Sequence, residues 1–253
     1  MRNQEQWIPS KYVYHHGRLI ASRDTEEVSI GDRLLGDRIA GFYERYLPEY
    51  VMGRLIDLGC GRVPLYATYR EYVDEVICVD WGNTSHQTSH LDYECDLTQA
   101  LPFVDGEFNT IILSDVLEHI PEPEALWWEM SRILAPGGVI LLNVPFFYRL
   151  HEEPYDYYRY TEHALRRFAE RAGFDVILLE PAGGTPEIFA DLFGRHLRFV
   201  PIIGNTLVAA IQRLTSALVA TAWGQRLSAS TGRMFPLGYF LIARKATSPS
   251  LSG

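Results

Sequence analysis

The stretch that decides the fold is RLIDLGCGRVP, residues 54–64. Its apolar first half ends at two glycines, Gly59 and Gly61, which predicts a buried strand followed by a tight turn. Glycines at such a turn let backbone N–H groups approach a ligand closely. A dinucleotide fingerprint would need a third glycine where Pro64 stands, and Asp57 would sit poorly beside a pyrophosphate. A cofactor that carries a positively charged amino-acid group fits this loop better.

Strand-like and helix-like segments alternate outward from this loop. The runs typical of strands are residues 54–58, 75–80, 91–95, 109–114, 138–144, 176–180 and 237–245. Apolar residues at helical spacing occupy residues 32–47, 122–135 and 161–174, and Pro48 is expected to end the first of these helices. The alternation predicts an α/β fold with seven strands, a mostly parallel sheet and helices on both faces.

Four segments are expected along the chain. Residues 1–31 form an arm that packs on or over the main domain, and residues 32–180 form a cofactor-binding core. Residues 181–236 interrupt the alternation of strands and helices with two or three helices. These helices are expected to form an insert that serves as a cap or an interface. Residues 237–253 supply the last strand and a polar tail that is expected to fray.

Composition excludes several classes of protein. The chain has 253 residues, 47% of them apolar, and a net charge of −9, which disfavours an electrostatic grip on nucleic acid. Cys60, Cys78 and Cys95 are too few and too scattered for a disulfide framework or a zinc site, and they fit a reducing cytoplasm. No secretory signal and no run of 18 apolar residues is visible, so we expect a cytoplasmic protein without a membrane span.

A second acid supports a nucleoside site. Asp80 ends the second strand, 19 residues after Gly61, where a carboxylate can accept both hydroxyls of a ribose. Trp81 follows and could stack on a purine. The alternatives are that Asp80 caps a turn or helix, that Trp81 packs at the domain edge, and that the loop is a simple turn with no ligand.

These motifs resemble a known family. RLIDLGCGRVP, VICVD, ECDL, FNTIILSDVLEHI and LAPGGVILLNVP follow one another in this order. Together they resemble the class I S-adenosylmethionine-dependent methyltransferases, specifically the type 11 group. The resemblance covers about residues 50–180 and the terminal strand. It implies a Rossmann-like sheet whose last strand is antiparallel, and S-adenosyl-L-methionine as the cofactor.

The resemblance also implies which residues bind the cofactor. The glycine loop would lie under the methionine and ribose, the acid after the second strand would bind the ribose, the next pair would contact the adenine, and the end of the fourth strand would face the methionine amino group. In that order these residues are Asp57, Gly59, Gly61, Asp80, Asp96, Leu97 and Ser114. One position departs from the family, because Val63 stands where a third glycine is usual.

The methyl acceptor is expected outside the carboxyl ends of the fourth and fifth strands. After the fourth strand, His119 is a candidate general base, and the alternative is a histidine that only shapes the cofactor pocket. Asp115, Glu118 and His119 also include metal-ligand types, so a divalent cation is considered. Their order matches no metal motif, and we expect no tightly held metal.

The loop after the fifth strand is unusually rich in functional side chains. Residues 145–161 hold five tyrosines, two arginines and a histidine, a composition that suits sugars or aromatic rings. We expect His151 or Tyr158 to line the acceptor pocket, whereas Asp156 and Arg159 are spaced for a local ion pair. Thr161 fits the N-cap of the next helix. The pattern H-x-x-P-x-D-Y-x-R-Y-T resembles type 11 members associated with bacterial surface-glycan synthesis.

The predicted function is methylation of a sugar or glycan hydroxyl by in-line displacement, with His119, His151 and Tyr158 as candidates for removing the proton. A quinone, lipid or other small-molecule acceptor is the alternative, and a non-catalytic S-adenosylmethionine-binding regulatory subunit is the alternative of another class. The apolar segment 199–223 is interpreted as a lid, a homodimer face or a contact with a membrane or lipid-linked acceptor. We expect residues 185–230 to cover the acceptor pocket.

Overall fold

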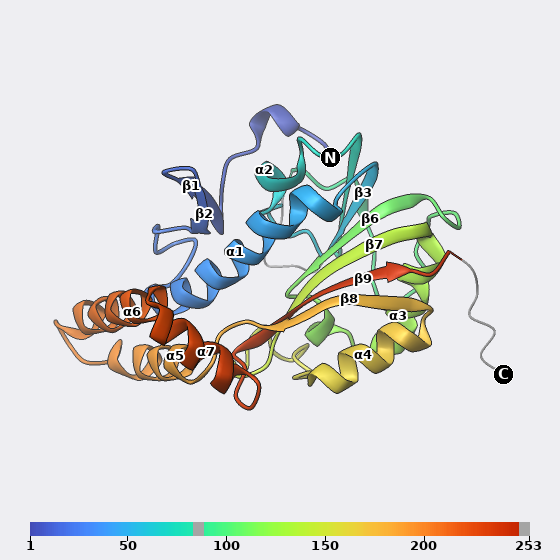
Figure 1. The fold of residues 1–253 in the computed structure, drawn as a ribbon. Helices are drawn as coiled ribbons and strands as arrows, with labels where there is room; N and C mark the ends of the chain where they lie inside the picture. Colours follow the sequence, from blue (N-terminus) through green and yellow to red (C-terminus); the bar gives the residue numbers. More distant parts are fainter. Residues whose placement is uncertain (83–88, 248–253) are drawn as a thin grey trace.

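The computed structural model describes residues 1–82 and 89–247, and a seven-stranded sheet forms their centre (Figure 1). The strands are β3 (Arg54–Leu58), β4 (Glu75–Asp80), β5 (Tyr93–Glu94), β6 (Phe108–Ser114), β7 (Leu134–Pro145), β8 (Phe174–Pro181) and β9 (Gly238–Lys245). Their order is β5-β4-β3-β6-β7-β9-β8, and β9 is antiparallel to both of its neighbours while the other pairs are parallel. The predicted Rossmann-like sheet with an antiparallel last strand is confirmed.

Helices cover both faces of this sheet because neighbouring residues on a strand point to opposite sides. On β6, Ile111 packs with the helices α3 (Pro123–Ile133) and α4 (Glu162–Arg171). Ile112 packs on the other face, with α1 (Arg33–Tyr50) and α2 (Tyr66–Tyr69). Both side chains are fully buried, so the continuous apolar runs in the sequence mark strands buried on two faces.

Several element boundaries differ from the predictions, and the differences at α1 and β7 are the most informative. Pro48 does not end α1, which continues to Tyr50, because proline tolerates a helical φ and removes only one hydrogen bond of the last turn. β7 begins at Leu134, four residues before the predicted strand, and pairs there with Phe108 before the register shifts. Thr161 is the N-cap of α4 as expected, since its side chain accepts from the Ala164 N–H at 3.2 Å. The tail residues 248–253 lie outside the described part.

The N-terminal residues form a hairpin that no pattern in the sequence predicted. Strands β1 (Tyr12–His15) and β2 (Arg18–Ala21) pair antiparallel and pack against α1 (Figure 1). The side chains of Tyr12, Leu19 and Ala21 are buried. The hairpin lies at the end of the molecule where the parallel strands finish, so it is placed beside the ligand edge of the sheet.

The insert consists of α5 (Thr185–Leu197), α6 (Gly204–Ala220) and α7 (Ala222–Gly232), which pack on one another beyond the carboxyl ends of the parallel strands (Figure 1). Glu187 ties them to α1. Its carboxylate is fully buried, accepts from the Gly184 N–H at 3.0 Å and from the Ser228 hydroxyl at 2.6 Å, and pairs with Arg38.

Among the described residues no single helix has the length and apolar composition needed to cross a membrane. Only α6 and α7 together, bent by 98° at their junction, meet that length and composition. Several large apolar side chains of the insert are exposed, including Phe199, Ile202, Leu214 and Trp223.

We expect Glu187→Ala to lower the free energy of unfolding by about 3 kcal/mol, because it leaves the Arg38 guanidinium and two other donors without their acceptor. Urea denaturation measures the change. The matched control is Glu170→Ala on the exposed side of α4, which should alter stability by less than about 0.5 kcal/mol. Equal stabilities of the two variants would contradict the anchoring role of Glu187.

Candidate active site

The glycine loop after β3 is tightly constrained. Gly59 has a φ of +69°, and a Cβ added there would lie 2.5 Å from Cγ2 of Val116, so only glycine fits. Val63, at the position where the family usually has glycine, adopts a φ of +51° and is fully buried. Its carbonyl accepts from the Trp7 indole N–H at 3.0 Å. The N-terminal arm therefore contacts the side of the loop that departs from the family pattern.

Asp80 holds this loop from the neighbouring strand. One of its carboxylate oxygens accepts from the Gly61 N–H and the other from the Trp81 N–H, each at 2.9 Å. The carboxylate is buried, and the Cys95 N–H donates to the Asp80 carbonyl at 2.8 Å. Parallel pairing of β3 with β4 thus brings the glycine loop, Asp80 and the segment that follows β5 to one edge of the sheet.

Asp57 lies beneath the same loop. Its carboxylate accepts from the Tyr69 hydroxyl at 2.9 Å and is almost completely buried. Burial raises the pKa of Asp57 to about 7, and the charge of Asp80 adds to the increase. A cationic ligand group beside Asp57 would favour its charged form, which matches the chemistry expected from the loop.

The other predicted cofactor residues are spread along the same edge. Trp81 makes an edge-to-face contact with Tyr155, the ring centroids being 5.0 Å apart. Asp96 is exposed and accepts from the Thr98 N–H at 2.9 Å, whereas Leu97 is buried in the core. Their roles at a purine stay predictions, and Ser114 lies further along, at the end of β6.

A cavity of about 170 Å³ opens where β6 and β7 end. Its walls combine the N-terminal arm, through Lys11 and Tyr12, with α1 and the two loops that follow these strands. One wall is a polar network in which Lys11 pairs with Asp115 at 2.6 Å and the Asn143 amide donates to Asp115 at 2.6 Å. Ser114 in turn donates to Asn143 at 2.8 Å, so this predicted site residue supports the cavity wall.

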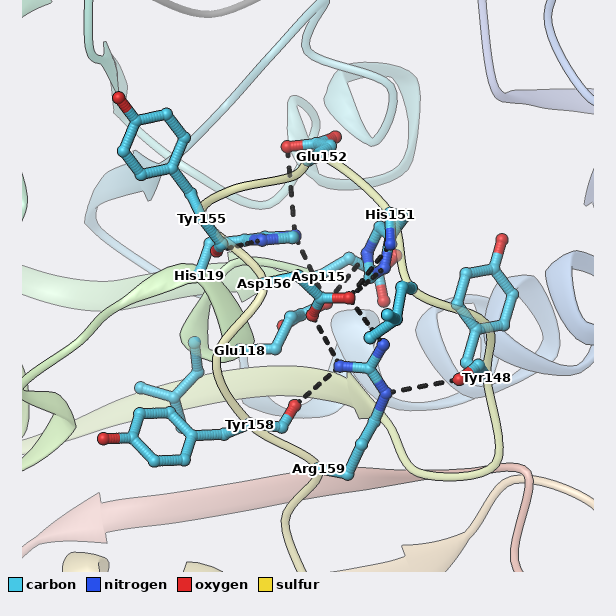
Figure 2. A network of polar contacts seen from close by, with 12 residues as sticks. Asp115, Glu118, His119, Tyr148, His151, Glu152, Tyr155, Asp156, Tyr158 and Arg159 are labelled. Carbon is cyan, nitrogen blue, oxygen red and sulfur yellow. Dashed lines mark hydrogen bonds and ion pairs between the residues drawn. The ribbon is translucent and has the colours of Figure 1, made fainter.

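Glu118, His119 and His151 converge on this cavity (Figure 2). The two imidazole rings are 4.7 Å apart between centroids. Nε2 of His119 and Nε2 of His151 each lie 3.8 Å from the same oxygen, Oε1 of Glu118. Both histidines were predicted as catalytic candidates, and the fold brings them together although 31 residues separate them in sequence.

The electrostatics of this cluster follow from its burial. Glu118 is fully buried, which raises the pKa of its carboxyl well above the usual range, and Asp115 adds to the increase. Burial and the neighbouring His119 lower the pKa of His151. Asp156 lies 3.3 Å from Nδ1 of His151, and hydrogen bonds from Arg159 hold the pKa of Asp156 well below its usual range.

The loop of residues 151–160 clamps the cluster in place. Arg159 binds both oxygens of Asp156, at 2.6 and 2.8 Å, so the predicted ion pair is present. The N–H groups of Tyr157 and Tyr158 donate to the Glu118 carbonyl, at 3.0 and 3.3 Å. The aromatic and charged residues of this loop therefore serve in large part to position the residues beside the cavity.

Tyr158 does not line this cavity, and its role as a catalytic candidate stays a prediction. Its hydroxyl donates to the Pro121 carbonyl at 2.8 Å, and its ring points away from the two histidines (Figure 2). Tyr158 lies on a loop whose backbone is bound to Glu118, which turns this side chain outward. Tyr148 lines the cavity instead.

Residues 185–230 supply none of the residues that line this cavity, and their role as a cover of the acceptor pocket stays a prediction. The N-terminal arm lines the cavity through Lys11 and Tyr12, and the insert contacts residues of its wall. Arg195 of α5 pairs with Asp32 at 2.6 Å and stacks over the Tyr148 ring, 4.5 Å from its centroid. Periodicity could indicate the helices of the insert but not which side of the pocket they occupy.

Comparison with known proteins decides the family. The model of a family described as a methyltransferase domain matches residues 32–179, more than half of the chain. The chain belongs to this methyltransferase-domain family. The class I S-adenosylmethionine-dependent resemblance is thereby confirmed, with S-adenosylmethionine as the cofactor.

Individual similarities are partial. The chain is 33% identical over 119 residues to an uncharacterized methyltransferase of Mycobacterium marinum, covering 45% of this chain and 44% of the relative. It is 26% identical over 113 residues to the ubiquinone biosynthesis O-methyltransferase of Idiomarina loihiensis, covering 41% and 46%. These matches span less than half of the curated relatives. A SAM-dependent methyltransferase from Archaeoglobus fulgidus has the same fold, with a TM-score of 0.55, 20% identity and coverage of 85% and 97%.

We expect Asp80→Ala to weaken the binding of S-adenosylhomocysteine by about 1.5–3 kcal/mol, because it removes charged acceptors at the ribose position and releases the glycine loop. Isothermal titration calorimetry measures the affinity. Asp74→Ala, an exposed residue just before β4, is the control and should bind normally. Unchanged affinity in a folded Asp80→Ala protein would contradict the assignment.

Asp57 should make stability depend on pH. Its pKa is about 7 in the folded protein and about 3.9 in an unfolded chain, so the folded state retains a proton that the unfolded state loses. Stability contributed by this group therefore falls as the pH rises from 4 to 7. Relative to wild type, Asp57→Asn should gain about 2–4 kcal/mol across this window in urea denaturation without cofactor. A difference that stays constant with pH would contradict the shift.

Proposed function

We propose that the protein transfers a methyl group from S-adenosylmethionine to a neutral hydroxyl group of a sugar or glycan. One observation carries the proposal: two imidazoles and a buried carboxylate converge on the cavity at the carboxyl ends of β6 and β7, next to the glycine loop. Gly59 and Val116 join the two places, because the glycine lies directly against the valine that follows Asp115.

The residues present fit the cofactor. Asp80 offers a buried carboxylate for ribose hydroxyls, Gly59 lets the loop pack against Val116 beside the cavity, and Asp57 offers a partner for a cationic group. When bound, S-adenosylmethionine supplies a methyl group that is already activated by the sulfonium charge. The chain then has to orient the acceptor, exclude water and receive a proton, and good alignment alone is worth several kcal/mol of barrier.

The charges around the cavity favour a neutral acceptor. Carboxylates of Asp32, Asp115, Glu118 and Glu152 line it together with one lysine, Lys11. Arg195 pairs with Asp32 and Lys11 pairs with Asp115. Each of these cations is therefore already neutralised by a carboxylate and is not free to bind an anionic acceptor. A phosphate or carboxylate on the acceptor would therefore be repelled, whereas hydroxyl groups can donate to these oxygens.

Histidine nitrogens are the groups placed to act on an acceptor hydroxyl. Nδ1 of His119 lies 2.9 Å from the Tyr155 carbonyl, which requires a proton on Nδ1 and leaves the Nε2 lone pair toward Glu118 (Figure 2). His151 presents its Nε2 to the same oxygen. Both imidazoles therefore direct a basic nitrogen at one point of the cavity wall, where an acceptor hydroxyl would be held.

A quinone precursor is the second candidate acceptor. The likeness to a ubiquinone biosynthesis O-methyltransferase favours it, and so do the exposed apolar side chains of the insert, among them Phe189, Phe193 and Phe199. Such a surface suits the isoprenoid tail of a quinone precursor or a lipid-linked sugar.

The function is tested with S-adenosylmethionine carrying a labelled methyl group. The acceptors are methyl glycosides, oligosaccharides, a catechol that carries an isoprenoid tail and a sugar phosphate as the anionic control. The proposal expects label in a neutral glycoside or glycan and none in the sugar phosphate. Label in the catechol alone would assign the second candidate, and cofactor binding without turnover on any acceptor would support a regulatory subunit.

We expect His119→Ala and His151→Ala each to lower turnover by about 10²–10⁴ on the acceptor found in that screen, because each removes a nitrogen that faces the acceptor. Affinity for S-adenosylhomocysteine should change less in His151→Ala than in His119→Ala, which is nearer the glycine loop. His163→Ala on α4 is the exposed control. Full activity in both site variants would contradict a role in proton removal or acceptor binding.

A further inference from the structure

We propose that Glu118, His119 and His151 form a binding site for one divalent cation. One oxygen and two nitrogens, one from each residue, lie within 4.8 Å of one another on the wall of the cavity (Figure 2). No tightly held metal is expected from the sequence, because Asp115, Glu118 and His119 alone form no metal motif. The third ligand, His151, comes from a different loop.

The distances in this cluster fit a shared ion better than direct hydrogen bonds. Oε1 of Glu118 is 3.8 Å from Nε2 of His119 and 3.8 Å from Nε2 of His151, beyond hydrogen-bond length in both cases. Ligand atoms about 2.1 Å from one ion lie roughly 3.0–3.4 Å apart. A movement of less than about 1 Å would therefore bring all three atoms to an ion between them.

Glu118 supplies an independent observation. It is fully buried, and no hydrogen-bond donor among the described residues reaches either of its carboxylate oxygens. Buried polar atoms are nearly always paired, and leaving a carboxylate oxygen unpaired costs free energy. A cation held by Glu118 would satisfy the carboxylate on the side where the two imidazoles face it.

The surroundings of the histidines match those of metal ligands. The Nδ1 of His119 donates to the Tyr155 carbonyl at 2.9 Å, and Nδ1 of His151 lies 3.3 Å from the Asp156 carboxylate. The hydrogen bond to Tyr155 fixes the His119 ring and aims its Nε2 at the ion, while Asp156 places a carboxylate beside the His151 ring. Arg159 and the His151 N–H, at 2.9 Å, hold Asp156 in turn.

The charge balance also favours a dication. With Glu118 ionised as a ligand, Asp115, Glu118, Glu152 and Asp156 bring four negative charges to the cluster and its immediate neighbours, whereas Lys11 and Arg159 bring two positive ones. The excess of two negative charges is the charge that a divalent ion neutralises.

Two nitrogens and one oxygen select the kind of ion. Imidazole ligands suit Fe²⁺, Ni²⁺, Cu²⁺ or Zn²⁺, while Mg²⁺ and Ca²⁺ prefer oxygen ligands. Mn²⁺ also favours oxygen ligands, of which Glu118 supplies one, and it is the spectroscopic probe among these ions. Three protein ligands leave further coordination positions open, and these face the cavity because all three residues line it. Resting on the proposed function, we infer that one or two neighbouring hydroxyl oxygens of the acceptor occupy these positions. With the ion bound, the two imidazoles act as its ligands and not as bases, and the ion would lower the pKa of the bound hydroxyl so that its proton can leave to water.

Titration of the metal-free protein with Mn²⁺ tests the site, in the absence of cofactor and acceptor. Electron paramagnetic resonance counts free Mn²⁺, and the relaxation rate of water protons reports open positions on bound Mn²⁺. We expect one Mn²⁺ per chain with enhanced water relaxation, displacement by Zn²⁺, and no displacement by equimolar Mg²⁺. Glu118→Gln and His151→Ala should each weaken binding at least tenfold, and Asp156→Asn by about 10–100-fold.

His163→Ala and Glu170→Gln on the exposed side of α4 are the matched controls and should bind Mn²⁺ as wild type does. Circular dichroism and S-adenosylhomocysteine binding confirm that each variant is folded. Absence of stoichiometric binding to wild type, or binding that survives in folded Glu118→Gln and His151→Ala proteins, would overturn the site. Because no acceptor is used, the site can hold while the proposed acceptor fails, and the reverse.

Discussion

The parallel pairing of β6 with β7 is the constraint on which the site depends. Ser114 pairs with Asn143 at the end of this ladder, so the loops that follow both strands leave the sheet at the same edge. The Ser114 hydroxyl donates a hydrogen bond to the Asn143 side chain, and the Asn143 amide donates to Asp115. Strand pairing therefore places the two loops that carry Glu118, His119 and His151 next to each other.

Hydrogen bonds to the backbone fix the position of the second loop relative to Glu118. The loop of residues 151–160 donates two N–H groups to the Glu118 carbonyl, and the Tyr160 hydroxyl donates to the Leu117 carbonyl at 2.9 Å. These bonds lie on the buried side of the loop, whereas the charged atoms of the cluster face the cavity. Groups held by a packed second layer keep their positions when a ligand binds, which is what a reactive site requires.

The glycine loop, where the cofactor is expected, is in direct contact with the segment that leads to the cavity. Gly59 lies against Val116, and Val116 leads within two residues to Glu118. The N-terminal arm reaches both, through Trp7 at the glycine loop and Lys11 at the cavity. The arm is therefore the element that encloses the two sides together, while the insert supports Asp32 and Tyr148 from outside.

Local patterns sufficed for the sheet and the glycine loop, because strand periodicity and the spacing from Gly61 to Asp80 are properties of short segments. They failed where distant segments meet. Lys11 carries no local signal, since its partner Asp115 is 104 residues away. The grouping of His151 with Glu118 likewise depends on strand order, and only the folded loop shows that the Tyr158 hydroxyl is bound to the Pro121 carbonyl.

One crystal structure tests the central claim, that a cofactor loop and a dication site lie side by side at this edge of the sheet. It would contain S-adenosylhomocysteine and Mn²⁺, with diffraction recorded at the manganese absorption edge. We expect the ribose of the ligand on Asp80 and an anomalous peak between Glu118, His119 and His151. A ligand bound away from the glycine loop, or a cluster with no anomalous peak at saturating Mn²⁺, would contradict it.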